Sequence, residues 1–355
     1  MGQVIEDGEP LSSGARHGNI SVLADDSFPK GLSWYGAKTC LQRLHWRIRK
    51  NWMRELWDYC WCRQPKNLTA SDLARALEAF HDENRSYELD EQSPVFLLST
   101  GWRSGSTLLQ RIIVTDPNVL LWGEPFGDSA IFSQMAQMLY ALAHSPDIRL
   151  ATQRNDMLFS SLPTSWIATL YPSASEFRGA LQAFVFAWLG ESAKRHGFGR
   201  WGLKEVRLGA TEAILLHWLF PKSKFILLSR NPFDCYRSLA GSGWHHIYLK
   251  RPDIRVDSAA GIAKHWNRIA VSWLELPKSF PMFRVRYEDV VDNRFDFRDL
   301  ESWLGIKLNE SAALSKFVGS TTRRAELGLL QRRIIAREAR AGISALGYSQ
   351  DSRDR

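Results

Sequence analysis

The segment from Pro94 to Phe126 (PVFLLSTGWRSGSTLLQRIIVTDPNVLLWGEPF) constrains the fold of this 355-residue chain more than any other. It begins with the apolar run Val95–Leu98, which is typical of a strand buried on both faces of a parallel sheet. A turn rich in Gly, Ser and Thr follows, and apolar residues then recur at helical spacing until Asp116 and Pro117. A strand, a glycine-rich turn and a helix N-terminus in this order direct backbone N–H groups at an anion. The segment therefore predicts a phosphate or sulfate site.

Strand and helix patterns alternate along the rest of this part of the chain. Further strands are expected at Trp201–Leu203, Phe225–Leu228 and Phe283–Arg286, a helix runs through Ile214 to Leu219, and a last helix spans roughly Leu329 to Ala345. This alternation predicts an α/β, three-layer, P-loop-like fold with a central parallel sheet and helices on both faces.

Ligands in such sheets bind beyond the carboxyl ends of the strands. The loops at Gly101, Glu124, Lys204 and Arg230 are therefore expected to lie together, with Arg103 and Glu124 at neighbouring strand tips.

Composition divides the chain into three regions. Residues 1–30 predict a flexible tail, residues 31–90 a basic, Trp-rich helical extension, and residues 91–350 the main domain. Within that extension a helix is expected to open at Thr69–Asp72. Within the main domain, residues 127–193 predict a helical insertion that builds an acceptor wall or lid. The apolar stripe of residues 33–62 fits two uses, peripheral contact with an anionic membrane or packing on this domain or a protein partner, and periodicity favours packing.

The charge and the cysteines restrict the class of protein. A net charge of +8 and a pI near 9.4 suit an anionic ligand, a lipid surface or nucleic acid, but no nucleic-acid-binding motif is present. Four cysteines without a CxxC pair indicate reduced thiols. With no apolar run long enough to span a membrane and no signal-peptide pattern, we expect a cytoplasmic protein, with residues 33–62 leaving peripheral membrane contact open.

The glycine-rich turn differs from a nucleotide P-loop. In Walker A the lysine after the second glycine reaches the β- and γ-phosphates, and a hydroxyl binds magnesium. Here the basic residue is Arg103, before the second glycine, and Ser106 stands at the lysine position. The turn therefore disfavours a triphosphate with magnesium, and no metal site is expected.

From about Pro94 to Tyr348 the chain resembles the PAPS-dependent sulfotransferases, whose sulfuryl donor is 3′-phosphoadenosine 5′-phosphosulfate (PAPS). It carries their first loop, Arg103 to Thr107, and their later Arg230 and Ser238 pair, eight residues apart. It also shares their Arg-Tyr-Glu-Asp stretch at 286–289 and Leu-Gly-Tyr at 346–348. The resemblance implies that the loop binds the 5′-phosphosulfate and the later pair the 3′-phosphate. The donor-binding residues that it implies are Trp102, Arg103, Ser104, Gly105, Ser106, Thr107, Arg230, Ser238 and Tyr287.

The closer resemblance is to the branch that contains the tyrosylprotein sulfotransferases and related bacterial enzymes. The catalytic His of the cytosolic enzymes would fall at position 206, which is Val206 here. The branch of the tyrosylprotein sulfotransferases instead uses a Glu, matched by Glu124, and a Lys near the transferred group, matched by Lys204. The resemblance thus implies Glu124 as general base, with Lys204 and Arg103 stabilising charge. Simpler interpretations remain, namely a helix-terminal carboxylate for Glu124 and an ion pair with Glu205 or Glu124 for Lys204.

The chain departs from that pattern in places. Ser242 stands where the protein-modifying relatives have an Arg, and the C-terminal segment is shorter, so the loop that covers the adenine is sought near residues 319–324. His245 and His246 fit a polar loop better than a metal site. The sequence as a whole predicts sulfuryl transfer from PAPS, without a metal, to an acceptor hydroxyl on a carbohydrate, lipid or small metabolite. The alternatives are a kinase-like P-loop phosphotransferase and a non-catalytic binding protein of the same fold.

Overall fold

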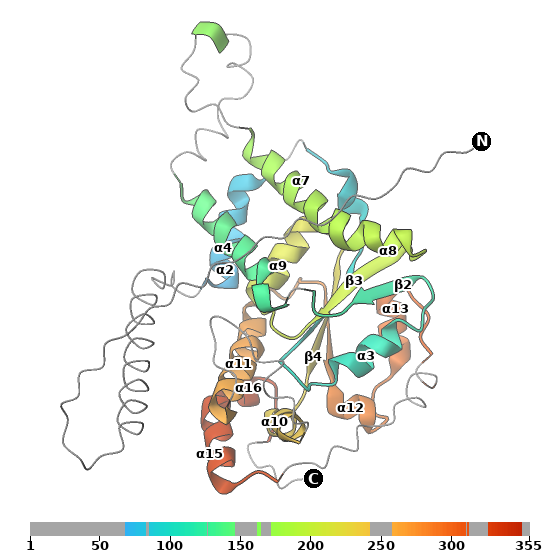
Figure 1. Cartoon of the computed structure of the whole chain (residues 1–355), viewed down its shortest axis with the longest axis vertical. Coiled ribbons are helices and arrows are strands. Elements are labelled where there is room, and N and C mark those ends of the chain that lie inside the picture. The colour runs from blue at the N-terminus through green and yellow to red at the C-terminus, as the bar shows by residue number, and fades with distance from the viewer. Residues whose placement is uncertain are drawn as a thin grey trace, which may run out of the picture. The chain divides into compact units, whose positions relative to one another are not determined.

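The computed structural model describes residues 68–82, 85–125, 127–145, 162–164, 172–241, 258–309, 311 and 326–349 (Figure 1). The chain divides into two compact units, Met1–Pro65 and Lys66–Arg355, and every described residue belongs to the second. The predicted tail and the Trp-rich stripe of residues 33–62 lie outside the described residues.

A five-stranded parallel sheet forms the centre of the second unit. Its order is β2-β3-β1-β4-β5, and the strands are β1 (Val95–Ser99), β2 (Val119–Trp122), β3 (Arg200–Glu205), β4 (Lys224–Ser229) and β5 (Met282–Arg286). In the register of the sheet, Leu98 lies opposite Glu205 on one side and Leu227 on the other. The predicted α/β fold with a central parallel sheet is confirmed.

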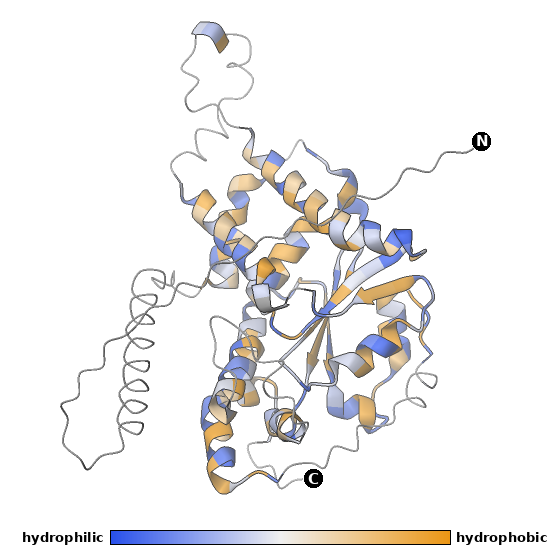
Figure 2. Cartoon of the chain, in the orientation of Figure 1, coloured by the Kyte–Doolittle hydropathy of each residue, from blue (hydrophilic) through white to orange (hydrophobic). Residues whose placement is uncertain are grey.

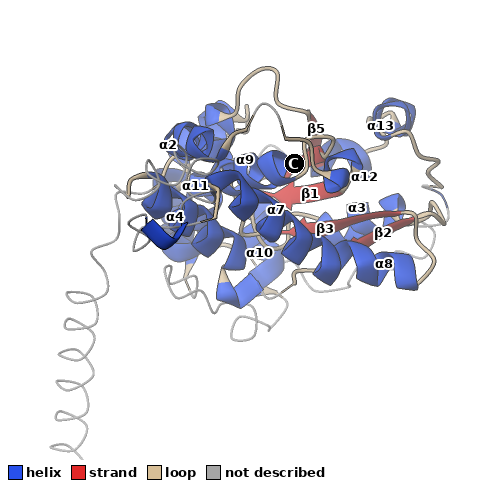
Figure 3. Ribbon diagram, turned by 90° about the horizontal axis from the view of Figure 1, so that it is seen from above, coloured by secondary structure: helices blue, strands red, loops and turns tan. Residues whose placement is uncertain are grey.

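Side chains of β1 alternate between the two faces of the sheet, and each face is covered by helices (Figure 3). Phe96 and Leu98 belong to one apolar cluster, and Val95 and Leu97 to another. The first cluster includes residues of α2 (Ala70–Leu77), η1 (Glu78–Phe80), α4 (Ile131–Ala143), α7 (Ala174–Val185), η5 (Phe186–Gly190), α8 (Glu191–Arg195), α9 (Ala210–Leu219) and η6 (Trp273–Glu275). The second includes residues of α3 (Ser106–Ile113), α12 (Tyr287–Val291) and α13 (Phe297–Leu304).

A third apolar cluster joins the helices that follow β4 to the end of the chain. It is formed by α10 (Pro232–Ala240), α11 (Ala259–Ser272), α15 (Leu329–Glu338) and α16 (Arg340–Ala345). The predicted last helix is thus two helices, separated at Ala339. Figure 2 shows hydrophobic colouring along β2, as a sheet covered on both faces requires. In the described part of the chain, no helix is long and apolar enough to cross a membrane.

The compact unit begins earlier in the chain than the predicted boundary near residue 90. As expected, Thr69 caps α2, because its hydroxyl accepts a hydrogen bond from Asp72 N at 3.1 Å. However, Leu73 and Leu77 of this helix are buried in the first cluster with the sheet. The residues from Lys66 onward therefore belong to the sheet-containing unit rather than to a separate extension.

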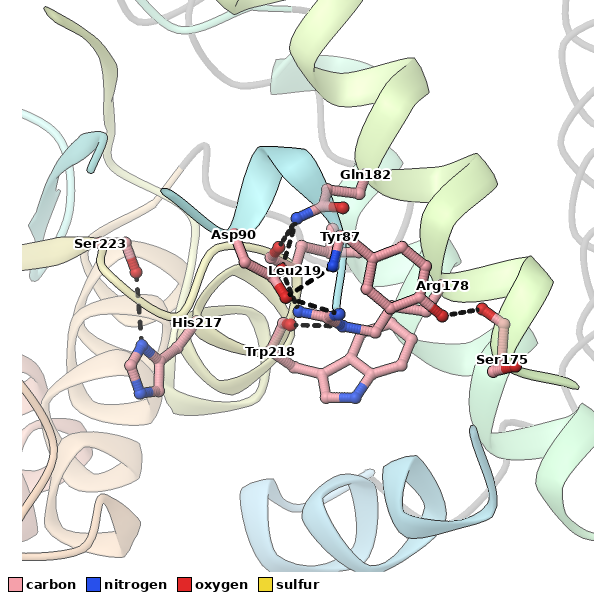
Figure 4. A network of polar contacts seen from close by, with 9 residues as sticks. All are labelled: Tyr87, Asp90, Ser175, Arg178, Gln182, His217, Trp218, Leu219 and Ser223. Atoms are coloured by element: carbon pink, nitrogen blue, oxygen red, sulfur yellow. Dashed lines mark hydrogen bonds and ion pairs between the residues drawn. The ribbon is translucent and has the colours of Figure 1, made fainter. Parts of the chain in front are cut away.

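A polar network fixes the segment just before β1 to this unit (Figure 4). Asp90, in the short helix η2 (Glu88–Glu91), accepts hydrogen bonds from Arg178 Nη2 at 2.6 Å and Gln182 Nε2 at 2.8 Å. The Arg178 guanidinium also lies 4.6 Å from the ring centre of Tyr87 and 5.6 Å from that of Trp218. The start of β1 is thereby held against α7 and α9.

Two further short helices, η3 (Gly127–Ser129) and η4 (Leu162–Thr164), lie with α4, α7, η5 and most of α8 in the predicted insertion, residues 127–193. The described part of that insertion is helical, as the sequence predicts.

Candidate active site

The turn after β1 has a backbone that favours glycine. Gly101 and Gly105 have φ values of 147° and 89°, and Arg103 has a φ of 62°, which an L-residue with a long side chain rarely adopts. Gly105 precedes α3, and its carbonyl accepts hydrogen bonds from Leu108 N at 2.9 Å and Leu109 N at 3.2 Å. The strand, glycine turn and helix predicted from the sequence are therefore formed. The first N–H groups of α3 have no partner within the helix and can donate hydrogen bonds to an anion at the turn.

The ring of Tyr287 packs directly on this turn. A Cβ atom added to Gly105 would lie 2.0 Å from Cδ2 and 2.3 Å from Cε2 of that ring. The guanidinium carbon of Arg230 lies 4.2 Å from the ring centre of Tyr287, a cation–π arrangement. Tyr287 therefore contacts both the first loop and the arginine of the second motif.

The two sequence motifs also meet through hydrogen bonds. Arg103 Nε donates to Ser238 Oγ at 3.0 Å, and Arg230 Nη1 donates to the Arg103 carbonyl at 2.8 Å. These partners are 135 and 127 residues apart in the sequence. The structure thus brings Arg103, Arg230, Ser238 and Tyr287 together at the carboxyl ends of β1, β4 and β5.

Several buried polar atoms of this region have no hydrogen-bond partner among the described residues. They include Ser104 Oγ, Trp102 Nε1 and Arg230 Nε. Ser104 is fully buried and Trp102 is 5% exposed, so leaving these groups unpaired is costly. Each of the three atoms can donate a hydrogen bond, which is the complement of an anionic ligand. Ser106 is also buried, whereas Thr107 is exposed.

A second cluster lies at the carboxyl ends of β2 and β3. Glu124 Oε1 accepts from Lys204 Nζ at 2.5 Å, and Glu124 Oε2 accepts from Arg207 Nη1 at 2.8 Å. The side chains of Lys204 and Arg207 are 8% and 7% exposed, and that of Glu124 is 21% exposed. The ion pair that the sequence left open for Lys204 is therefore present, and its partner is Glu124.

The expectation that Arg103 and Glu124 lie at neighbouring strand tips is wrong. β3 lies between β1 and β2, so the strand next to Glu124 carries Lys204 instead. The described polar contacts of the Arg103 side chain go to Ser238, in α10. Strand order depends on long-range packing, and the local sequence pattern does not contain it.

Arg207 is the residue that sequence reasoning missed. Its Nη1 also donates to Glu205 Oε1 at 2.8 Å, and its guanidinium carbon lies 5.3 Å from the ring centre of Trp102. Arg207 therefore connects the first loop to Glu124. The only signal in the sequence was a second cation three residues after Lys204, in the run Lys-Glu-Val-Arg.

Burial governs the charges around Arg207. Burial raises the pKa of Glu205, and the nearby Glu124 raises it further, while Arg207 opposes both effects. Burial by itself would lower the pKa of Arg207, but Glu205 and Glu124 outweigh it, so the pKa of Arg207 is raised. His265 of α11 supports the same region, because its ring lies 4.5 Å from that of Trp102 and its Nε2 lies 3.0 Å from the Val206 carbonyl oxygen.

Some predicted features cannot be placed. Ser242, His245, His246 and residues 319–324 lie outside the described residues. Within the described part of the chain, no group of three or more His, Cys, Asp or Glu side chains is arranged to hold a metal ion.

Comparisons with known proteins give one family and several distant structures. A model of the Sulfotransferase family matches residues 94–310. A search of curated proteins finds no match. Among solved structures, the sulfotransferase domain of the Synechococcus PCC 7002 olefin synthase is 19% identical, with 75% of this chain and 99% of that chain covered and a TM-score of 0.34. A sulfotransferase from Alicyclobacillus acidocaldarius is 15% identical, with 71% of this chain and 94% of that chain covered and a TM-score of 0.39. Mouse sulfotransferase SULT7A1 complexed with PAP is 15% identical, with 81% of this chain and 74% of that chain covered and a TM-score of 0.32.

Proposed function

Because its residues 94–310 match the family model, this chain belongs to the sulfotransferase family, and we propose that it moves a sulfuryl group from PAPS to an acceptor hydroxyl with Glu124 as general base. One observation carries the donor assignment. Arg103 of the first loop contacts Ser238 and Arg230 of the second motif, so that cations and a hydroxyl from two distant segments form one anion-binding region.

The residues of this region fit a donor with two anionic ends. The turn at Gly101–Gly105 and the N-terminus of α3 suit the 5′-phosphosulfate, and Ser104 Oγ and Trp102 Nε1 are buried donors available to it. Arg230 and Ser238 suit the 3′-phosphate. Arg230 Nε is a further buried donor, and Tyr287 holds the guanidinium in place. Ser106 and Thr107 complete the predicted donor-binding loop.

The chemistry requires a proton acceptor and stabilisation of negative charge. As the acceptor oxygen forms its bond to sulfur, its O–H bond breaks and the proton passes to a carboxylate oxygen of Glu124. The bond between sulfur and the phosphate oxygen breaks in the same displacement, and 3′-phosphoadenosine 5′-phosphate (PAP) leaves with that electron pair. Lys204, beside Glu124, and Arg103, in the loop, supply positive charge for the sulfuryl and phosphate oxygens.

Both oxygens of Glu124 are engaged by cations, Lys204 at one and Arg207 at the other. An acceptor hydroxyl must therefore share or replace one of these contacts in order to reach the carboxylate. Residues 127–193, whose described part is helical, begin three residues after Glu124, and we assign this segment the role of acceptor wall. The acceptor is a hydroxyl on a carbohydrate, a lipid or a small metabolite.

Calorimetric titration with PAP tests the donor assignment. The wild-type protein should bind PAP equally well with and without EDTA, and Arg230→Ala should weaken binding by about 10- to 100-fold, the cost of losing hydrogen bonds to a charged group. Arg298→Ala is the matched control, because Arg298 is an exposed arginine of α13 paired with Asp296. Absence of PAP binding to the wild type would overturn the donor assignment.

The same titration separates the proposal from a kinase-like phosphotransferase. A kinase would bind ATP together with magnesium, so EDTA would abolish formation of its productive ATP complex. The sequence disfavours that activity, because Ser106 stands where Walker A has its lysine.

Transfer of label from radioactive PAPS to a panel of carbohydrate, lipid and small alcohol acceptors tests the base. Glu124→Gln should retain PAP affinity and lower kcat by about 10²- to 10⁴-fold, the usual contribution of a general base. Glu301→Gln of α13 serves as the control, since the Glu301 carboxylate accepts from Leu308 N at 2.7 Å. Unchanged turnover by Glu124→Gln would place the base elsewhere, and no transfer by the wild type would favour a binding protein.

A further inference from the structure

Two segments of the chain contain residues, Glu288 and Tyr348 among them, that have no role in the proposed chemistry, and the structure brings these segments together. They are Arg286–Asp289, at the end of β5, and Leu346–Tyr348, after α16. The Tyr348 hydroxyl donates to Glu288 Oε2 at 3.2 Å, and the same hydroxyl lies 2.9 Å from Ser229 Oγ. The guanidinium carbon of Arg286 also lies 4.3 Å from the ring centre of Tyr348. The end of the domain is therefore joined to the ends of β4 and β5.

These contacts hold the residues on either side of Arg230. Ser229, just before it, is bonded to Tyr348, and Asn231, just after it, donates its backbone N–H to Glu288 Oε1 at 2.8 Å. The Arg230 carbonyl itself accepts from Trp266 Nε1 at 3.0 Å. Residues 229–231 are thus each held by a contact, through the side-chain hydroxyl of Ser229, the carbonyl of Arg230 and the N–H of Asn231.

The same network reaches the other member of the donor pair. The Asn231 side chain caps α10 by accepting from Phe233 N at 3.0 Å, and α10 carries Ser238. Tyr287, the neighbour of Glu288 in α12, supports the Arg230 guanidinium. Glu288 therefore sits where it can set both the backbone and the side-chain support of Arg230, together with the start of the helix that presents Ser238.

The network is buried, which makes its geometry demanding. Glu288 is 3% exposed, Ser229 6% and Tyr348 8%. Buried polar groups are costly unless they are bonded, so removal of one partner leaves the others unsatisfied and shifts the backbone that they hold. Burial and the nearby Glu288 raise the pKa of Tyr348, which keeps its hydroxyl protonated and able to donate.

We propose that Glu288 and Tyr348 are positioning residues for the donor's 3′-phosphate, acting through Ser229 and Asn231 on Arg230 and Ser238. This inference rests on the proposed function, since it takes Arg230 and Ser238 as the 3′-phosphate site. It assigns Glu288 and Tyr348 a common task, which is to fix that site rather than to touch the donor.

The test compares PAP with adenosine 5′-monophosphate, which lacks the 3′-phosphate. Tyr348→Phe keeps the aromatic packing and removes the hydroxyl that joins Glu288 to Ser229. Ser229→Ala removes the link at β4 and keeps the Tyr348–Glu288 bond. Tyr87→Phe is the matched control, because its hydroxyl donates to the Ser175 carbonyl at 2.5 Å in the network before β1. Each protein is titrated with both nucleotides by calorimetry and unfolded thermally.

Ser229→Ala loses one hydrogen bond and should weaken PAP binding by about three- to tenfold, and Tyr348→Phe, which loses two, should weaken it at least as much. Both variants should leave binding of the monophosphate unchanged. Tyr87→Phe should lower thermal stability without changing the ratio of the two affinities. Equal weakening of both nucleotides, or no weakening of either, would overturn the inference. A wild-type protein that binds PAP no better than the monophosphate would instead overturn the 3′-phosphate assignment of the proposed function, and the inference with it.

Discussion

Gly105 offers a sharp test of the contact between the first loop and Tyr287. Gly105 and Gly197 have nearly the same φ, 89° and 85°, so an alanine at either position adopts a left-handed backbone. That conformation costs an L-residue about 1–2 kcal/mol, of which about 0.4–1 kcal/mol is recovered because alanine restricts the unfolded chain. The two positions differ in what the new Cβ meets, which is nothing within 4 Å at Gly197 and the ring of Tyr287 at 2.0 Å at Gly105.

Gly197→Ala should therefore cost no more than about 1.6 kcal/mol, the range left by these two terms. Gly105→Ala should cost about 1–3 kcal/mol more, because the ring must move as in an overpacked core. With about 2–4 °C in Tm for each kcal/mol in a domain of this size, the second variant should unfold about 2–12 °C below the first. Displacing the ring also disturbs Arg230, so Gly105→Ala should lose at least about tenfold in PAP affinity, equivalent to 1.4 kcal/mol.

Thermal unfolding and calorimetric titration with PAP check both effects. The double variant Gly105→Ala/Tyr287→Ala removes the ring that the methyl group meets, so the stability cost of the alanine should fall to that seen at Gly197. The reasoning is refuted if Gly105→Ala is as stable as Gly197→Ala and binds PAP with wild-type affinity.

Two further predictions concern buried ionisable groups. The folded-state pKa of Glu205 is raised above its ordinary value of 4.5. The contribution of Glu205 to the free energy of unfolding is therefore complete below pH 4.5 and is lost as the pH rises through the folded-state pKa. Glu205→Gln should flatten the fall of Tm above about pH 4.5, whereas a profile unchanged from the wild type would show that Glu205 does not carry the effect. Burial raises the pKa of the Cys235 thiol to about 12, so at pH 8 mass spectrometry should find Cys235 alkylated only after denaturation, and rapid labelling of the native protein would contradict its burial.

Local pattern was enough to predict the elements that build the proposed donor site. The apolar run of β1, the glycine-rich turn and the apolar spacing of α3 lie within twenty residues, and each has a local physical cause. The break between α15 and α16 at Ala339 left no such trace, because alanine favours a continuous helix. The start of the compact unit at Lys66 was also missed, since the packing of α2 against the sheet is a long-range contact.

For the candidate site as well, some features could be predicted from the sequence and others could not. The residues of the donor motifs could be named in advance because a family resemblance supplied them, but not their contacts, which join residues more than a hundred positions apart. Arg207 was missed because an isolated arginine in a sequence gives no sign that it will be buried between two carboxylates. The position of Glu124 relative to Arg103 was wrong because it depends on strand order, which emerges only when the whole sheet assembles.

That strand order divides the labour of the sheet into two adjoining halves. Gly105, Arg230 and Tyr287 follow the carboxyl ends of β1, β4 and β5, while Glu124 follows β2 and Lys204 lies near the end of β3. In the proposed function, the residues that bind the nucleotide lie at the ends of β1, β4 and β5, and the group that deprotonates the acceptor lies after β2. The insertion of residues 127–193 also begins soon after β2 ends at Trp122. Evolution can therefore remodel the acceptor half for a new alcohol while the nucleotide half stays intact, and a chimera that exchanges residues 119–193 between family members would transplant acceptor choice as a module.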